Sequence, residues 1–161
     1  MFPSDGGASS HTVGDRVFFS SDVARLAEVS LRQLQWWDER KVVSPRKEGH
    51  RRIYAASQVL EILVVAALLR KGLSLQRIRR VLRLLRRELG QPRQNNWERG
   101  SRLYVLTDGQ SVRLESHPDR LLKLLTDAPR AMHVVSLSDQ VRRIATDKGS
   151  QRYLAKQLLL F

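Results

Sequence analysis

The 161-residue sequence predicts a mainly helical protein that ends in a small α+β part. Between residues 20 and 90, apolar side chains recur every three or four positions in three segments, which is the spacing of one helix face, and a fourth segment is apolar nearly all round. Beyond residue 103, two short apolar runs flank Asp108-Gly109, a dipeptide typical of a β-hairpin turn. The later order of strand, strand, helix, strand, helix is typical of a compact α+β module.

The charge of the chain lies mostly in one segment. The formal net charge is +13, and residues 31–102 hold 18 Lys and Arg against 6 Asp and Glu. An excess concentrated in this way predicts a polyanionic partner. The absence of cysteine excludes disulfides, thiolate metal sites and cysteine nucleophiles, and the four scattered histidines suggest no metal site and no cofactor.

The N-terminal residues and the lengths of the apolar stretches indicate the expected location of the protein. Residues 1–16 are rich in Ser and Gly, and we expect them to form a disordered tail without the features of a secretory signal. No apolar stretch reaches the roughly 18 residues of a membrane span. We therefore expect a cytoplasmic protein with no membrane contact.

Two short helices begin the ordered part. Val17-Phe18-Phe19 predicts an extended entry, and Ser20 or Ser21 is expected to cap the first helix. Ser30 is expected to cap a second helix, Leu31–Arg40. The buried side of this second helix is expected to contain three apolar residues at spacing three: Leu31, Leu34 and Trp37.

A basic loop and two longer helices follow. Residues 46–52 form a loop around Gly49, which permits a tight backbone turn, and Ile53-Tyr54 returns as a strand. Ser57 is expected to cap a helix that is apolar nearly all round and therefore belongs in a core. Ser74 is expected to cap the next helix, which combines a leucine-rich seam with a face of arginines.

The C-terminal half predicts a separate small unit. Pro92 ends the preceding helix, and residues 91–102 are a polar linker. Strands are expected at residues 103–107, 111–116 and 131–135. Helices are expected at 118–125 and, capped by Ser138, at 138–145. The predicted domains are therefore a first domain at 17–90, a dimerisation or interaction module at 103–147 and a C-terminal tail at 148–161.

Residues 18–90 resemble the winged helix-turn-helix of the MerR family of bacterial transcription regulators. The resemblance is carried by the stretches DVARLAEVS, LRQLQWWDERKVVSPRKEG, HRRIY and LLRKGLSLQRIRRVL, in the order and spacing of that family. It implies double-stranded DNA as the partner, with the second helix in the major groove and the loop acting as a wing on the phosphates. The resemblance does not extend to the C-terminal part.

The second helix contains the candidate base-reading residues. Arg32, Gln33 and Gln35 are expected to face outward near its N-terminal half, where Arg pairs best with guanine and Gln with adenine. The alternative is a solvated surface for the glutamines and a phosphate contact for Arg32. The resemblance suggests that Trp36 is the DNA-facing ring of the Trp36-Trp37 pair. The family usually has Arg where this chain has Gln35, which suggests a different operator.

The wing contains the candidate phosphate contacts. In the family, the Arg of the G-x-x-R-x-Y pattern binds phosphate and the Tyr supports it, which implies these roles for Arg52 and Tyr54. A solvated basic loop is the alternative. The remaining candidate DNA contacts are Arg40, Lys41, Arg46, Lys47, His50 and Arg51.

The predicted function is a sequence-specific, dimeric transcriptional regulator without enzymatic activity, because no catalytic constellation is present. Regulators of this type usually dimerise through a long helix, which Pro92 and Gln94-Asn95-Asn96 interrupt here. A homodimer would therefore use the leucine seam, the C-terminal module or an edge of its hairpin. One alternative is an antitoxin-like autoregulator that holds a partner protein through residues 103–161. The other is a DNA-bending recombination or architectural factor.

Overall fold

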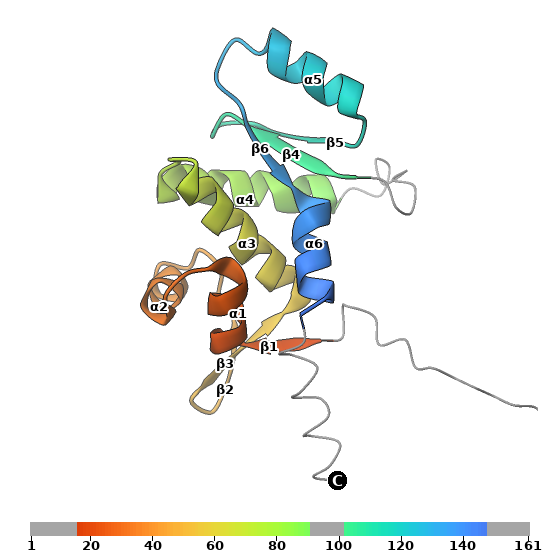
Figure 1. The fold of residues 1–161 in the computed structure, drawn as a ribbon. Coiled ribbons are helices and arrows are strands. Elements are labelled where there is room, and N and C mark those ends of the chain that lie inside the picture. Colours follow the sequence, from red (N-terminus) through yellow and green to blue (C-terminus); the bar gives the residue numbers. More distant parts are fainter. Residues whose placement is uncertain (1–15, 91–101, 148–161) are drawn as a thin grey trace, which may run out of the picture.

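The computed structural model describes residues 16–90 and 102–147, and Figure 1 shows their arrangement. Helix α3 (Ala56–Arg70) lies at the centre because it is apolar on nearly every side. Five of its side chains are completely buried: Val59, Ile62, Val64, Val65 and Leu68 have relative exposures of 0%. The helix packs against α1, α4 and α6 and against strands of two separate sheets, so most of the fold is built on it.

The first sheet and two short helices lie at one end of α3. Strand β1 (Val17–Phe19) and strand β2 (Arg46–Glu48) flank β3 (Arg51–Ala55), and both pairings are antiparallel. Helices α1 (Ser20–Ala27) and α2 (Leu31–Glu39) follow β1 and pack against each other. The β2–β3 hairpin protrudes next to them (Figure 1).

The second sheet covers α3 and α4 at the other end. Helix α4 (Leu75–Leu89) buries one apolar face and exposes most of its arginines. Strand β4 (Tyr104–Thr107) is central in the order β5-β4-β6, with antiparallel neighbours on both sides. Helix α5 is the outermost element, and α6 returns along α3 (Figure 1). The bounds of the remaining elements are Val112–Glu115 (β5), Pro118–Asp127 (α5), His133–Ser136 (β6) and Leu137–Ala145 (α6).

One hydrophobic cluster joins the two halves of the chain. Val105, Val135, Leu137 and Ile144 belong to the same buried cluster as the core residues of α1 to α4. The segment after the linker therefore adds to the core around α3. The expected mainly helical fold with a small α+β part is confirmed.

Three of the expected helix caps are wrong. Phe19 precedes α1, and its N–H donates to the Asp22 carboxylate at 3.0 Å, so Ser20 and Ser21 lie inside the helix. Ser57 likewise lies inside α3, where Gln58 Oε1 accepts from the Ala55 N–H at 2.9 Å. In each case, a side chain at the third helical position reaches back to the residue before the helix.

The third wrong cap is at α6. The Ser136 hydroxyl accepts from the Asp139 N–H at 3.2 Å, while the Ser138 hydroxyl accepts from the Leu103 N–H at 2.7 Å. The caps expected from Ser30 and Ser74 are confirmed, since these hydroxyls accept from Gln33 and Arg77.

The predicted tails largely lie outside the described residues, as does the linker except for Arg102. At the edge of the first tail, Arg16 is described and donates through Nη1 to the Ala145 carbonyl at 2.8 Å. Within the described ranges, no helix combines the length and apolar character needed to cross a bilayer.

Candidate nucleic-acid interface

Helix α2 is fixed by its buried side and presents a polar face to solvent. Leu34 and Trp37 are each only 2% exposed and hold the helix against the core. The opposite face exposes Arg32, Gln33 and Gln35, as the sequence predicted. Two of these three side chains already have intramolecular partners. The Gln33 Oε1 accepts from the Ser30 N–H at 3.1 Å, and the Gln35 Nε2 donates to Glu39 at 2.9 Å.

Leu31 was expected in the core, and that expectation is wrong. It is 57% exposed, whereas Leu34 one turn later is buried. Leu31 is the first helical residue of α2, and it borders a surface hollow. The three-residue spacing puts Leu31 on the same side of α2 as the buried Leu34 and Trp37. The spacing does not show that the core stops short of the first turn of this helix.

The tryptophan pair divides between core and surface, as expected. Trp37 is buried, whereas Trp36 is 42% exposed. The Arg40 guanidinium lies over the Trp36 ring, 5.1 Å from its centroid, at the C-terminal end of α2. The exposed face of α2 therefore carries an aromatic ring and a cation next to its polar side chains.

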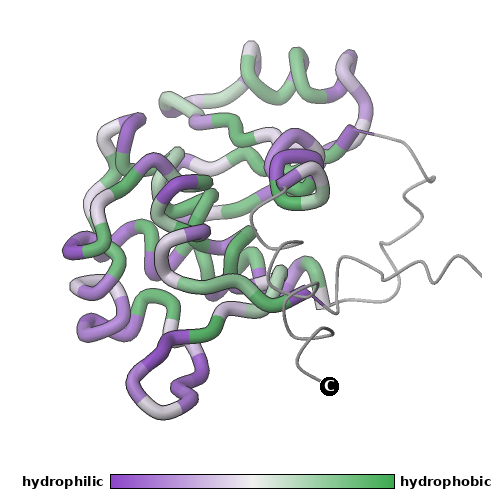
Figure 2. Tube along the Cα trace, turned by 60° about the horizontal axis from the view of Figure 1, so that its bottom comes forward, coloured by the Kyte–Doolittle hydropathy of each residue, from purple (hydrophilic) through white to green (hydrophobic). Residues whose placement is uncertain are grey.

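The β2–β3 hairpin carries most of the other predicted cations. Gly49 turns the chain with φ = +60°, a conformation that side chains with a Cβ rarely adopt. Lys47, His50 and Arg51 are exposed around this turn, and Arg46 pairs with Glu48 at 2.6 Å. The protruding tip of the hairpin is strongly hydrophilic in Figure 2. The hairpin therefore places cations at the edge of the molecule.

An ion pair ties the hairpin to α2. The Arg52 Nε donates to the Asp38 Oδ2 at 2.6 Å, and both side chains are mostly buried. This hydrogen bond raises the pKa of Arg52 above its ordinary value. Tyr54, on the same strand, is 1% exposed, and burial raises the pKa of its hydroxyl. Arg52 is thus held in a fixed position relative to the exposed face of α2.

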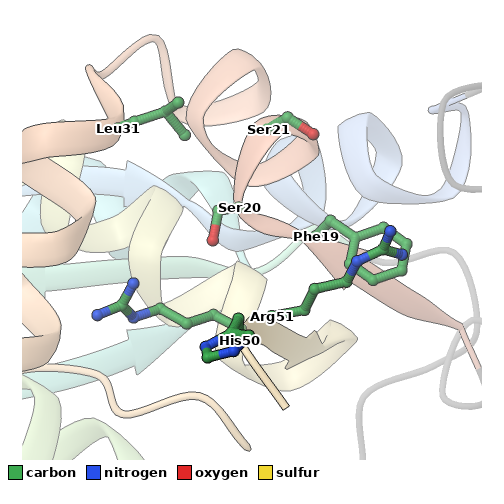
Figure 3. Close-up of a pocket in the computed structure, with 7 residues that line it drawn as sticks. Phe19, Ser20, Ser21, Leu31, His50 and Arg51 are labelled. Carbon is green, nitrogen blue, oxygen red and sulfur yellow. The ribbon is translucent and has the colours of Figure 1, made fainter. Parts of the chain in front are cut away.

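The hairpin, α1 and α2 together enclose a surface hollow, the first hollow (Figure 3). The hollow brings together residues that are more than thirty positions apart in the sequence. Arg51 crosses toward Phe19, with its guanidinium 5.6 Å from the ring centroid. The lining residues are Phe19, Ser20, Ser21, Leu31, His50, Arg51 and Arg52.

A second hollow lies at the other end of α2. It joins the C-terminal end of that helix to the arginine face of α4, and its lining is mostly cationic. Arg86 at its edge is held by Glu61, with both contacts at 2.7 Å, and this hydrogen bond raises the pKa of Arg86. The lining residues are Arg40, Lys41, Val42, Gln76, Arg79, Leu82, Arg83 and Arg86.

Comparison with known families identifies the domain that carries the first hollow and, apart from Arg86, the second. Residues 19–85 match the model of the MerR HTH family regulatory proteins. Residues 19–85 form a MerR-family helix-turn-helix domain. The match contains α1, α2, the hairpin, α3 and most of α4, and it confirms the family that the sequence motifs predicted.

Two curated relatives are similar to part of this chain. They are the HTH-type transcriptional regulators GlnR of Bacillus anthracis and Bacillus cereus, each 36% identical over 61 residues. The aligned part covers 37% of this chain and 47% of each relative. The chain thus spans about half the length of the curated relatives it matches.

The segment after the linker lies outside the MerR-family domain but is anchored to it. Arg25 on α1 donates to both carboxylate oxygens of Asp147, at 2.6 and 3.2 Å. The Asp147 side chain is only 4% exposed, and its hydrogen bond raises the pKa of Arg25. Arg143 on α6 also donates to the Leu26 carbonyl. These contacts fix the end of α6 against α1.

Several residues of the two hollows were not predicted as site residues. Phe19, Ser20 and Ser21 were assigned to the strand and the helix cap. Asp38 lines neither hollow but pairs with Arg52 of the first, and it had no predicted role either. Fourteen residues separate Asp38 from Arg52, so no helical or strand spacing reveals their contact. The arginines of α4 could be recognised, because a face of one charge is unfavourable unless an anion relieves it.

Proposed function

We propose that this chain is a transcriptional regulator that binds specific double-stranded DNA sequences. In this proposal, α2 enters the major groove and the β2–β3 hairpin lies as a wing on the phosphate backbone. The observation that supports it is the position of α2, whose exposed polar face lies between two hollows that each contain arginines. The MerR-family match of residues 19–85 and the similarity of part of the chain to transcriptional regulators support it as well.

The dimensions of α2 suit a major groove. An α-helix with its side chains is about 10–12 Å across, and the groove is about 12 Å wide. The nine residues of α2 extend roughly 14 Å at about 1.5 Å per residue. With α2 in the groove, the two hollows at its ends would face the phosphates of opposite strands. Lys47 and Arg51 would contact one strand, and Arg79 and Arg83 the other.

Base reading would depend mainly on Arg32. Gln33 and Gln35 each have an intramolecular hydrogen bond that a base edge would have to replace. Arg32 is exposed at the second position of α2, where a guanine could accept two hydrogen bonds from it. Arg52 would orient the hairpin from its ion pair with Asp38 and would direct its remaining donors toward phosphate.

A salt titration tests the proposal. Duplexes bound by the immobilised chain are selected from random sequence, and their affinity is measured between about 50 and 200 mM salt. We expect a steep loss of affinity with salt. Arg51→Ala should weaken binding to every duplex and should reduce the slope of log affinity against log salt concentration by about 1. Arg32→Ala should instead relax the preference at one base position.

The matched control is Arg120→Ala, which removes the same charge from α5 at the far end of the molecule. It should leave both the affinity and the slope unchanged. Equal losses for Arg120→Ala and Arg51→Ala would mean that net charge alone drives binding. An affinity that does not change with salt would contradict the phosphate contacts.

We further propose that the chain binds as a homodimer on two half-sites. One small domain makes few base contacts, whereas two copies related by two-fold symmetry double them. Sedimentation at tens of micromolar should give a dimer, and the selected motif should be palindromic. Cooperative binding to tandem sites would instead favour an architectural factor, and a co-purifying partner protein would favour an antitoxin-like autoregulator.

A further inference from the structure

Leu31 is an apolar residue in a strongly cationic surface. Its relative exposure of 57% is large for a leucine, and it begins the helix that the proposed function places in the major groove. An exposed leucine alone is ordinary, so its surroundings must carry the argument. Exposed large apolar side chains in the described segments are few, and only Leu31 and Trp36 among them belong to α2.

The surroundings of Leu31 select the chemistry of its partner. Arg32 follows it directly, and His50 and Arg51 lie across the first hollow from it (Figure 3). A partner that contacts Leu31 must also lie against these basic side chains. The surface therefore fits a polyanion that carries an apolar group between its charges, rather than an apolar protein face.

Duplex DNA presents one such group in its major groove. The 5-methyl group of thymine projects there and makes apolar contacts with protein side chains, while phosphates line both sides. We propose that Leu31 contacts a thymine methyl group and thereby selects thymine at one position of each half-site. This inference rests on the proposed function, and it adds a readout by apolar contact to the hydrogen bonds of Arg32.

Deoxyuridine substitution tests the contact, since uracil lacks only this methyl group. Each thymine of a selected duplex is replaced by deoxyuridine, one at a time, and the affinity is measured for the full chain. We expect the wild-type chain to lose about fourfold at one position of each half-site, which corresponds to the burial of one methyl group. Leu31→Ala should bind the thymine duplex more weakly and lose nothing further at that position.

The controls separate this inference from the proposed function. Leu31→Ala should fold normally, because alanine is the best helix former and the site is exposed. Leu122→Ala removes a leucine that is 66% exposed on α5, and it should retain the full difference between thymine and uracil.

Three outcomes would overturn the contact. Tight binding of the selected duplex by the wild-type chain with no sensitivity to uracil would refute the role of Leu31 and leave the proposed function intact. A change of oligomeric mass in Leu31→Ala would show that a second copy covers the leucine. Failure to enrich any duplex would remove both the inference and the proposed function.

Discussion

Arg52 shows how one residue can join two parts of the candidate interface. The sequence motif assigned it to phosphate, and its contact with Asp38 adds a structural role. The 2.6 Å bond links β3 to the C-terminal half of α2, so the hairpin and the helix hold a fixed relative orientation. Such preorganisation matters for recognition, since a fixed surface loses less entropy when it binds.

Loss of Asp38 should therefore destabilise the fold. Asp38→Ala removes a charged hydrogen bond between two mostly buried side chains, and we expect the free energy of unfolding to fall by about 1–3 kcal/mol. Urea denaturation measures this loss. Glu48→Ala, which breaks the exposed Arg46–Glu48 pair, should lose less than about 1 kcal/mol. Equal losses in the two variants would show that burial adds nothing to the Arg52–Asp38 pair.

Residue types alone could predict much of the candidate interface, but not its contacts. Arg32 and Arg51 were predicted correctly as exposed side chains, because charged residues without an ion partner seldom lie in the core. The partners of Gln33, Gln35 and Arg52 could not be predicted with the same certainty. Each side chain has several acceptors within reach, and only the folded backbone decides among them.

At the scale of elements, the sequence predicted the six helices of the described residues but not where each of them begins. Ser20, Ser21 and Asp22 are all good capping residues, so the sequence cannot decide which one begins α1. The hydrogen bond that the Phe19 N–H donates to the Asp22 carboxylate decides it, and Phe19 has no capping propensity of its own. The order β5-β4-β6 was also beyond the sequence, because pairing between distant strands depends on the complete fold.

The β4–β5 turn has a dependence on pH that can be tested. The N–H groups of Ser111 and Gln110 donate to the Asp108 carboxylate at 2.8 Å, and they hold the pKa of Asp108 below its ordinary value. A carboxyl whose pKa is lowered in the folded chain stabilises the fold at pH values above its unfolded pKa of about 3.9. This stabilisation is lost as the pH falls toward the lower pKa of the folded chain.

We therefore expect Asp108→Ala to lower stability at pH 7. Its difference from the wild-type chain should shrink as the pH falls below about 4, because the wild-type carboxylate then becomes protonated. Thermal unfolding of both chains would be measured across pH 3–7, a range that includes the ordinary Asp pKa of about 3.9. A constant difference over this range would show that the charge on Asp108 makes no contribution to the turn.

At the scale of the whole molecule, the MerR-family domain shares its hydrophobic core with the segment after the linker. Ile144 on α6 is 2% exposed within the cluster that also holds α1 to α4, and Asp147 anchors the end of α6 to Arg25. The sequence predicted two units separated by the linker, whereas residues from both sides of the linker pack in one core. Binary patterns could predict an apolar α3 but not which segment covers it.

A pair of α6 variants tests this shared core. Ile144→Ala should lower the free energy of unfolding by about 2–5 kcal/mol, because it leaves a cavity against the core. Val141→Ala, at a position that is 43% exposed on the same helix, should have little effect. The fluorescence of buried Trp37 would follow the transition, in a background where Trp36 and Trp97 are replaced by Phe. A Trp37 transition that Ile144→Ala leaves unchanged would mean that the DNA-binding part unfolds independently.

The surroundings of α3 also affect protein engineering. A chimera that transplants residues 19–85 onto an unrelated effector would strip Val135, Leu137 and Ile144 from the neighbourhood of α3 and expose apolar surface to water. We expect such a fusion protein to aggregate through this exposed apolar surface. A functional graft must carry α6 along, or replace the residues of α3 that α6 covers with polar ones.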